Sequence, residues 1–200
     1  VVGFEKENRS AIEVLVRKDR ANLLVVGDTG VGKTSFVEGL VKMICEGRAP
    51  SSLASMKIFE LDLIALSQGV SYKGEVEDRF KEVVSSLLNE SDPVLYIDNI
   101  HRIEDKQSVL NGILPILKKL LSKNEMQVIC TTTSDGYTKD IEKDKELVAF
   151  FEKITIDEPS EEAAVEILMS RKDAYEAFHG IPVDPDVSEE IVRLAKRYFP

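Results

Sequence analysis

A short glycine-rich segment constrains the fold of this chain more than any other part of the sequence. Residues 27–34 read Gly-Asp-Thr-Gly-Val-Gly-Lys-Thr, which fits the pattern G-x-x-x-x-G-K-[ST]. An apolar run at 22–27 leads into the segment and a stretch of helical period begins at Lys33, the strand-to-helix context that this pattern requires. The glycines allow the backbone to point successive N–H groups inward as a nest for an anion. The sequence therefore predicts a phosphate-binding loop, against the alternative of a glycine-rich turn with a surface lysine.

The loop indicates a nucleoside triphosphate ligand with Mg²⁺, or descent from a protein that bound one. Lys33 brings a point charge to the β- and γ-phosphates, and the hydroxyl of Thr34 is suited to ligate the metal. The helix N-terminus behind the loop adds a partial positive charge. The loop residues that we expect to bind the nucleotide are Asp28, Thr29, Gly30, Val31, Gly32, Lys33, Thr34 and Ser35.

A second predicted site element is an acidic residue that ends an apolar run. Residues 94–98 read Val-Leu-Tyr-Ile-Asp, which places Asp98 at the carboxyl end of a predicted strand. Nucleotide-binding loops of this class work with a carboxylate in such a position, so we expect Asp98 and Thr34 to bind Mg²⁺. The alternative is a strand that simply ends in a polar residue.

Short apolar runs alternate along the chain with longer stretches of helical period. The apolar runs are 22–27, 57–63, 93–98, 126–133 and 152–157, and the helical stretches are 33–45, 75–88 and 107–123. This alternation predicts an α/β fold with a five-stranded parallel sheet and helices on both faces. Asp98 and residues 131–133 then fall at carboxyl ends of strands, where such sheets bind ligands.

The strand signals stop after residue 157. One helix is predicted from Ser160 to about His179, and another from Ser188 toward Tyr198. We therefore predict an α/β nucleotide-binding domain at 1–158 and a partial helical lid at 159–200. The chain lacks an initiator Met and stops without an evident end, so we expect a piece of a longer protein.

Composition argues against some partners. The chain has 26 basic and 36 acidic residues and a formal charge of −10, which disfavours general binding to nucleic acids or anionic membranes. No apolar run approaches the ~18 to 20 residues that span a bilayer, and no signal peptide is evident. Cys45 and Cys130 are expected to be buried free thiols in a reducing compartment. We expect a cytoplasmic protein with no nucleic-acid or membrane partner.

Several segments resemble the AAA+ ATPases, and within them the first nucleotide-binding domain of the Clp-type unfoldases ClpA, ClpB and ClpC. The segments are VVGFEKE, GDTGVGKTSFVEGL, SYKGEVEDRFKEVV, VLYIDNIH, TTTSDGYTKDIEKD, ITIDEPSEEAAVEIL and YEAFHGIPV, and they cover nearly the whole chain. The resemblance implies a P-loop AAA+ fold whose hexameric ring uses ATP to drive unfolded or tagged proteins through a central pore. In some branches a separate ClpP-type peptidase and adaptors work with the ring.

The resemblance also assigns further residues. Val1 and Val2 match the segment that packs against adenine, with a frayed hydrophobic end as the alternative. Thr133 matches the polar residue that senses the γ-phosphate, and the alternative is an ordinary strand-end threonine. The pore loop that grips the translocating chain is matched by Tyr72, Lys73 and Gly74. Here the alternative is a tyrosine packed on its own domain.

The chain departs from the family pattern directly after Asp98. The family has a glutamate there that polarises the attacking water, whereas this chain has Asn99. An amide can orient a water but cannot accept its proton, and losing general-base catalysis costs about 3 to 5 kcal/mol. The alternatives are a designed substitution that traps nucleotide, or replacement by another carboxylate such as Glu104.

A second departure concerns two arginines that the family places before a phenylalanine and that reach the γ-phosphate of the neighbouring subunit. This chain has Ala149 and Phe150 there, and an arginine finger contributes about 10³ to 10⁵ in rate. Lys143, Lys145 and Lys153 lie nearby in the sequence.

The two departures predict a module that binds ATP or ADP but hydrolyses ATP poorly, with Asp98, Asn99 and Thr133 at the catalytic positions. One alternative is a non-catalytic module for nucleotide-dependent assembly or regulation. The other is an active ATPase of the ClpB disaggregase type.

Overall fold

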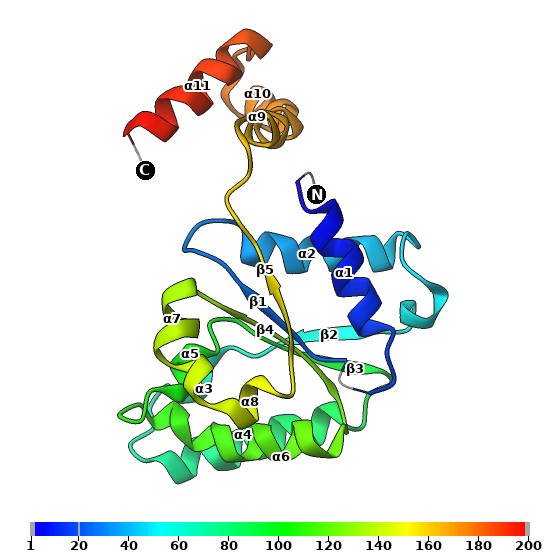
Figure 1. Cartoon of the computed structure of the whole chain (residues 1–200), viewed down its shortest axis with the longest axis vertical. Helices are drawn as coiled ribbons and strands as arrows, with labels where there is room; N and C mark the ends of the chain where they lie inside the picture. Colours follow the sequence, from blue (N-terminus) through cyan, green and yellow to red (C-terminus); the bar gives the residue numbers. More distant parts are fainter. Residues whose placement is uncertain (1–2, 20, 199–200) are drawn as a thin grey trace. The chain divides into compact units, whose positions relative to one another are not determined.

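The computed structural model describes residues 3–19 and 21–198, with a parallel β-sheet in its larger part (Figure 1). The strands are β1 (Leu23–Val26), β2 (Lys57–Glu60), β3 (Pro93–Ile97), β4 (Gln127–Thr132) and β5 (Glu152–Thr155). They lie in the order β2-β3-β4-β1-β5, and every neighbouring pair is parallel. Each strand falls inside one of the apolar runs, so the predicted five-stranded parallel sheet is confirmed.

Helices cover both faces of this sheet. In Figure 1, α1 (Glu5–Leu15) and α2 (Lys33–Cys45) lie on one face, and α4 (Lys73–Leu87) and α6 (Ile113–Lys123) lie on the other. The shorter elements are η1 (Ser51–Leu53), α3 (Leu63–Ser67), α5 (His101–Glu104), η2 (Val109–Gly112), α7 (Ser134–Lys139), η3 (Ile141–Lys143) and α8 (Lys145–Val148). Since both faces are covered, β1 is buried at every residue.

The core on the α4–α6 side fixes which way β3 faces. Leu95 and Ile97 pack in one cluster with Phe80 of α4 and Leu117 of α6. Each of these side chains contributes about 1.5–3 kcal/mol through its burial. Because side chains alternate along a strand, Tyr96 faces the opposite side of the sheet, toward α2.

The described chain separates into two compact units. One is Glu7–Ile156, and the other runs from Asp157 to the end of the described residues and also takes in residues 3–6. The second unit contains α9 (Glu161–Ser170), α10 (Lys172–His179) and α11 (Pro185–Tyr198). The sequence predicts that residues 3–6 belong to the same domain as the sheet. The predicted domain boundary at residue 158 stays a prediction.

The long helix predicted from Ser160 to about His179 is wrong, because two helices meet at Arg171. The hydroxyl of Ser170 donates a hydrogen bond to the carbonyl oxygen of Ile167 (2.7 Å). A serine that bonds to the preceding turn in this way favours a bend, and Ser170 is the last residue of α9.

The predicted start of the last helix at Ser188 is also wrong. α11 begins at Pro185, since proline suits the first turn of a helix, where its missing N–H is not needed. Ser188 lies buried within α11, and its hydroxyl contacts Sδ of Met169 (3.2 Å).

The expectation for the two cysteines is half correct. Cys130 in β4 is buried, and burial raises the pKa of its thiol. Cys45 is exposed, because it is the last residue of α2 and the adjacent Ile44 takes the buried position.

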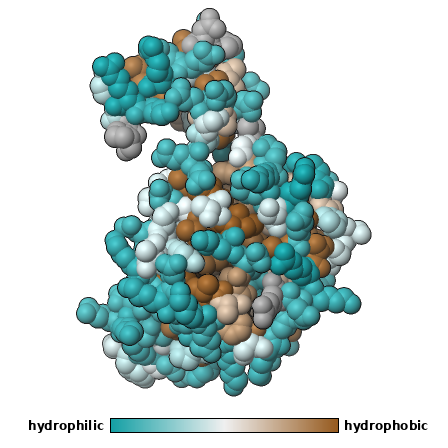
Figure 2. Space-filling view, in the orientation of Figure 1, coloured by the Kyte–Doolittle hydropathy of each residue, from teal (hydrophilic) through white to brown (hydrophobic). Residues whose placement is uncertain are grey.

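The surface agrees with a sheet enclosed by amphipathic helices. In the view of Figure 2, hydrophobic side chains gather over the sheet and hydrophilic ones cover the helices around it. Within the described ranges, no helix is both long enough and apolar enough to cross a membrane.

Candidate nucleotide-binding site

The loop between β1 and α2 has the backbone of an anion-binding nest. Gly30 and Gly32 have φ of 90° and 98°, in the left-handed region that favours glycine. Gly27 enters the loop so close to β5 that a Cβ there would lie 2.4 Å from the carbonyl oxygen of Ile156. All three positions therefore favour glycine, and α2 begins at Lys33 with its N-terminus behind the loop.

Lys33 points into the loop rather than into solvent. It is only 8% exposed, and Nζ donates hydrogen bonds to the carbonyl oxygens of Gly27 (2.9 Å) and Asp28 (2.7 Å). Burial lowers the pKa of its ammonium, and the charges of Asp98 and Asp28 oppose that shift. The alternative of a surface lysine is therefore excluded.

Asp98 follows β3 and is the centre of a hydrogen-bond network. Its Oδ1 accepts hydrogen bonds from the hydroxyls of Thr131 and Tyr96, the latter at 3.1 Å. Its Oδ2 accepts a hydrogen bond from Nδ2 of Asn99 (2.7 Å). The charge of Asp98 also opposes the lowering of the pKa of Lys33 by burial. The end of β3 and the loop after β1 therefore belong to one site.

Tyr96 joins this carboxylate to the loop, and sequence reasoning missed it. Burial and then the charge of Asp98 raise the pKa of its hydroxyl, and the neighbouring side chains of Thr131 and Thr34 lower it. The signal in the sequence is its position two residues before Asp98, on the same side of a strand.

Thr34 and Asp98 fit the predicted Mg²⁺ ion. Asp98 bonds to the hydroxyl of Tyr96, whose pKa Thr34 also affects, and both offer oxygen donors, the kind of ligand that Mg²⁺ prefers. The residues described contain no cluster of three or more His, Cys, Asp or Glu that could hold a metal. Mg²⁺ in nucleotide sites takes its other ligands from phosphate and water, so two side chains suffice.

Asn99 is held in an unusual backbone conformation. Its φ of 55° lies in the left-handed region, which asparagine tolerates better than most residues. Its backbone N–H donates to Oγ1 of Thr131 (3.0 Å), and its Nδ2 is turned to Asp98. The amide oxygen is left to orient a water, and it cannot take up a proton as a carboxylate does.

Two threonines at the end of β4 have different contacts. Thr133 is the N-cap of α7, since its Oγ1 accepts a hydrogen bond from the backbone N–H of Gly136 (2.9 Å). Thr131 is the threonine whose hydroxyl connects Asp98 and Asn99. The role of Thr133 as a γ-phosphate sensor stays a prediction, and Thr131 joins the site through contacts that the strand order creates.

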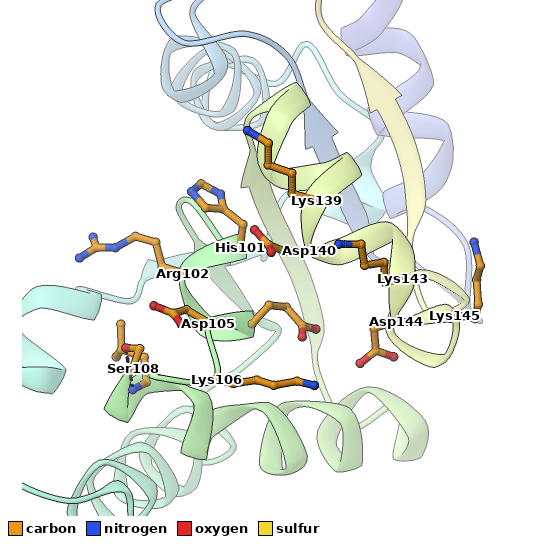
Figure 3. Close-up of a pocket in the computed structure, with 12 residues that line it drawn as sticks. His101, Arg102, Asp105, Lys106, Ser108, Lys139, Asp140, Lys143, Asp144 and Lys145 are labelled. Carbon is orange, nitrogen blue, oxygen red and sulfur yellow. Dashed lines mark hydrogen bonds between the residues drawn. The ribbon is translucent and has the colours of Figure 1, made fainter.

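Glu104 lines a different cavity from Asn99. Figure 3 shows this cavity, of about 950 Å³, between α5 with its following loop and the α7–η3–α8 segment. Burial, followed by the charge of Asp144, raises the pKa of Glu104 to about 7. Asn99 and Asp98 line a separate cleft of about 400 Å³. Glu104 is therefore poorly placed to replace the carboxylate missing at Asn99.

The predicted arginine-finger positions carry no charge. Ala149 is exposed, and Phe150 packs against the core. Lys143 and Lys145 line the large cavity in Figure 3, and Lys153 lies 4.7 Å above a tyrosine ring. None of these lysines lines the cleft at Asn99.

The predicted pore-loop residues lie at the start of α4. Tyr72 is 62% exposed, which disagrees with a tyrosine packed on its own domain. Lys73 is anchored, because its Nζ donates to the carbonyl oxygen of Lys106 (3.1 Å) and to Oδ1 of Asn111 (3.2 Å). A Cβ at Gly74 would lie 3.2 Å from the Tyr72 ring. The pore-loop role stays a prediction.

The predicted adenine contacts, Val1 and Val2, lie outside the described residues.

Comparison with known proteins decides the family. The model described as "ATPase family associated with various cellular activities (AAA)" matches residues 23–156, which contain all five strands and the loop. The chain belongs to this family of ATPases. The AAA lid domain matches residues 160–200, so the α/β AAA fold with a helical lid is confirmed.

The relatives support the Clp-type resemblance. Chaperone protein ClpB of Aquifex aeolicus is 36% identical over 99% of this chain and 20% of its own length. The Clp protease ATP-binding subunit ClpC of Staphylococcus epidermidis is 37% identical over 99% of the chain and 24% of its own length. The chain thus spans about a fifth to a quarter of these relatives.

Solved structures of Hsp104 have the same fold as this AAA chain. A complex of Hsp104 with ATPγS and FITC-casein has a TM-score of 0.89 and 37% identity, covering 100% of this chain and 34% of the other. The Hsp104–ADP complex of S. cerevisiae has a TM-score of 0.88 and 38% identity, covering 100% and 28%.

Proposed function

We propose that this AAA chain is the ATP-binding module of a Clp-type protein unfoldase and that it hydrolyses ATP slowly. The observation that carries the proposal is a contrast inside one network. Lys33 and Asp98 are held by hydrogen bonds that orient their charges, whereas the neighbour of Asp98 is the uncharged Asn99. The AAA family and the Clp and Hsp104 relatives support nucleotide binding in this fold.

Binding would use the loop and the end of β3 together. The N–H groups of the loop and Lys33 hold the β- and γ-phosphates, with residues 28–35 around them. Thr34 and Asp98 would hold Mg²⁺, which when bound neutralises phosphate charge. Tyr96 and Thr131 keep the carboxylate of Asp98 in position.

Hydrolysis would be slow for two reasons. The amide oxygen of Asn99 orients the attacking water but leaves its proton without a carboxylate acceptor at that position, which raises the barrier by about 3 to 5 kcal/mol. At Ala149 and Phe150 there is no arginine to stabilise the transition state in a neighbouring subunit.

We also propose a hexameric ring in the cytoplasm that threads unfolded or tagged proteins past Tyr72, Lys73 and Gly74. The exposure of the Tyr72 ring supports this, as does the likeness to Hsp104 bound to casein. A ClpP-type peptidase with adaptors is a proposed partner, because several relatives are ATP-binding subunits of Clp proteases.

Two experiments test the proposal in the intact protein. Titration with ATP and ADP should show binding that Lys33→Ala weakens, while phosphate release stays far below that of a ClpB or ClpC control. Turnover at the control rate, lost on Lys33→Ala, would instead favour an active ATPase of the disaggregase type.

The second experiment separates the unfoldase from a module for assembly or regulation. Tyr72→Ala should abolish substrate unfolding and leave ring assembly intact. Unfolding that survives this change favours the assembly module.

A further inference from the structure

The cleft at Asn99 contains a carboxylate that the sequence pattern does not reveal. This cleft is lined by the residues after β3, by Arg102 and by the segment from the end of β2 into α3. Its carboxylates belong to Glu60, Asp62 and Asp98. Two of these three are already engaged by other groups.

Asp98 accepts three hydrogen bonds, from Tyr96, Asn99 and Thr131. Asp62 is the N-cap of α3, since its Oδ1 accepts hydrogen bonds from the backbone N–H groups of residues 64 and 65, both at 2.9 Å. Glu60 is exposed and, among the described residues, has no hydrogen-bond or ion-pair partner. Its carboxylate is therefore the one in the cleft that is free to act on a water.

The parallel register directs Glu60 to the correct side of the sheet. Glu60 of β2 is aligned with Tyr96 of β3, and the N–H of residue 61 donates to the carbonyl oxygen of Tyr96 (2.8 Å). Directly paired residues in a sheet face the same side, and Asp98 follows Tyr96 by two positions. Glu60, Tyr96 and Asp98 thus share one face, at the edge of the sheet where parallel sheets bind ligands.

We propose that Glu60 is the general base for the slow ATP hydrolysis of this domain, working beside the amide of Asn99. Asn99 orients a water through its amide oxygen, and the water oxygen attacks the γ-phosphorus. The bond from that phosphorus to the β,γ-bridging oxygen breaks, the electron pair leaves with ADP, and one water proton moves to the carboxylate of Glu60. Inorganic phosphate and ADP are released, and Glu60 returns the proton to solvent.

This inference rests on the proposed function and names the group that performs its chemistry. Arg102 is exposed and lines the same cleft, where its positive charge offsets part of the repulsion between three carboxylates and a triphosphate. The family pattern has its catalytic carboxylate on the residue after Asp98. In this arrangement the carboxylate is that of Glu60, at the end of the neighbouring strand β2.

The test compares Glu60→Gln with Asp62→Asn in the intact protein. Each change removes one negative charge from the cleft, and Asn keeps the helix-capping acceptor that Asp62 provides. Glu60→Gln should lower kcat about 10²-fold and leave the Kd for ATP within about twofold, whereas Asp62→Asn should leave both within about twofold.

A pH profile and a rescue variant separate a base from a structural residue. The wild-type rate should fall toward acidic pH, because a protonated carboxylate cannot accept the water proton, and Glu60→Gln should lack this fall. The double change Glu60→Gln with Asn99→Glu should restore turnover to at least the wild-type rate, which also shows that the variant folds.

Three results would each overturn the role of Glu60. One is an equal rate for wild type and Glu60→Gln, and another is an equal loss in both single variants. The third is a wild-type rate no higher than that of Lys33→Ala. Nucleotide binding is measured separately in every variant. If the wild type binds no nucleotide, the proposed function itself fails. If it binds nucleotide but Glu60→Gln leaves the hydrolysis rate unchanged, the inference alone fails.

Discussion

The loop after β1 and the end of β3 lie in one site, yet they hold their polar groups differently. Lys33 is buried against two carbonyl oxygens of its own loop, and its charge is fixed before any phosphate arrives. Asn99 donates its backbone N–H to Thr131 and its side-chain Nδ2 to Asp98, so its neutral amide oxygen is the acceptor that it offers to a water. Binding of phosphate and activation of water are therefore separable properties of this site, because they depend on different strands.

The largest expected effect comes from placing a carboxylate at position 99, beside the attacking water. Asn99→Glu should raise kcat by about 10² or more, since general-base catalysis contributes about 10²- to 10⁴-fold. Steady-state phosphate release measures this. Asn124→Glu is the matched control, because Asn124 also has a left-handed φ (51°) but lies at the end of α6, so it introduces the same strain and charge. No gain in kcat for Asn99→Glu would contradict the proposal that residue 99 faces the attacking water.

A change on the phosphate-binding side, at Lys33, should lower the affinity for nucleotide. Lys33→Ala removes a charge-assisted donor worth about 1.5–3 kcal/mol, so the Kd for ATP should rise about 10- to 100-fold. Fluorescence titration with a labelled nucleotide measures it. Lys42→Ala, at an exposed position on the same helix, should leave the Kd unchanged. An unchanged Kd in Lys33→Ala would show that Lys33 does not bind the phosphates.

The close packing of the phosphate loop should show in the stability of the fold. Gly27→Ala forces a Cβ against the carbonyl of Ile156 and should lower the free energy of unfolding by about 2–3 kcal/mol. Gly30→Ala meets no atom within 4 Å and should cost about 1 kcal/mol from its positive φ alone. Urea denaturation measures both, and a larger loss at Gly30 than at Gly27 would refute the close approach.

The smallest effect belongs to the cavity beside the site. Burial raises the pKa of Glu104 from 4.5 to about 7, so the folded state binds its proton more tightly than the unfolded state. This contribution is complete below pH 4.5 and is lost as the pH rises through about 7. Glu104→Gln should remove about 1 kcal/mol of this pH dependence, a value reduced for partial solvent screening.

Denaturation at pH 5 and pH 8 measures the difference for Glu104→Gln. The exposed Glu142, changed to Gln, is the control. An unchanged pH dependence in Glu104→Gln would show that the carboxyl is solvated in the folded state.

Sequence predicted what is local and missed what depends on strand order. The glycine pattern predicts the loop because its geometry is encoded in consecutive residues, and alternating periods predict the strands. Tyr96, Thr131 and Glu60 reach the site only because β2, β3 and β4 are neighbours, which a single sequence does not reveal. The break at Arg171 was also missed, because the apolar spacing continues through it; there the hydroxyl of Ser170 bonds to the carbonyl of Ile167.

The unequal burial of the two cysteines allows one of them to be labelled selectively. Cys130 is enclosed in β4, while Cys45 is exposed at the end of the helix whose first turn carries Lys33. With 13 residues and about 1.5 Å of rise each, α2 separates the two ends by roughly 18 Å. A fluorophore attached under mild conditions would label Cys45 alone. Nucleotide occupancy could then be followed from the far end of the helix without engineering a new residue.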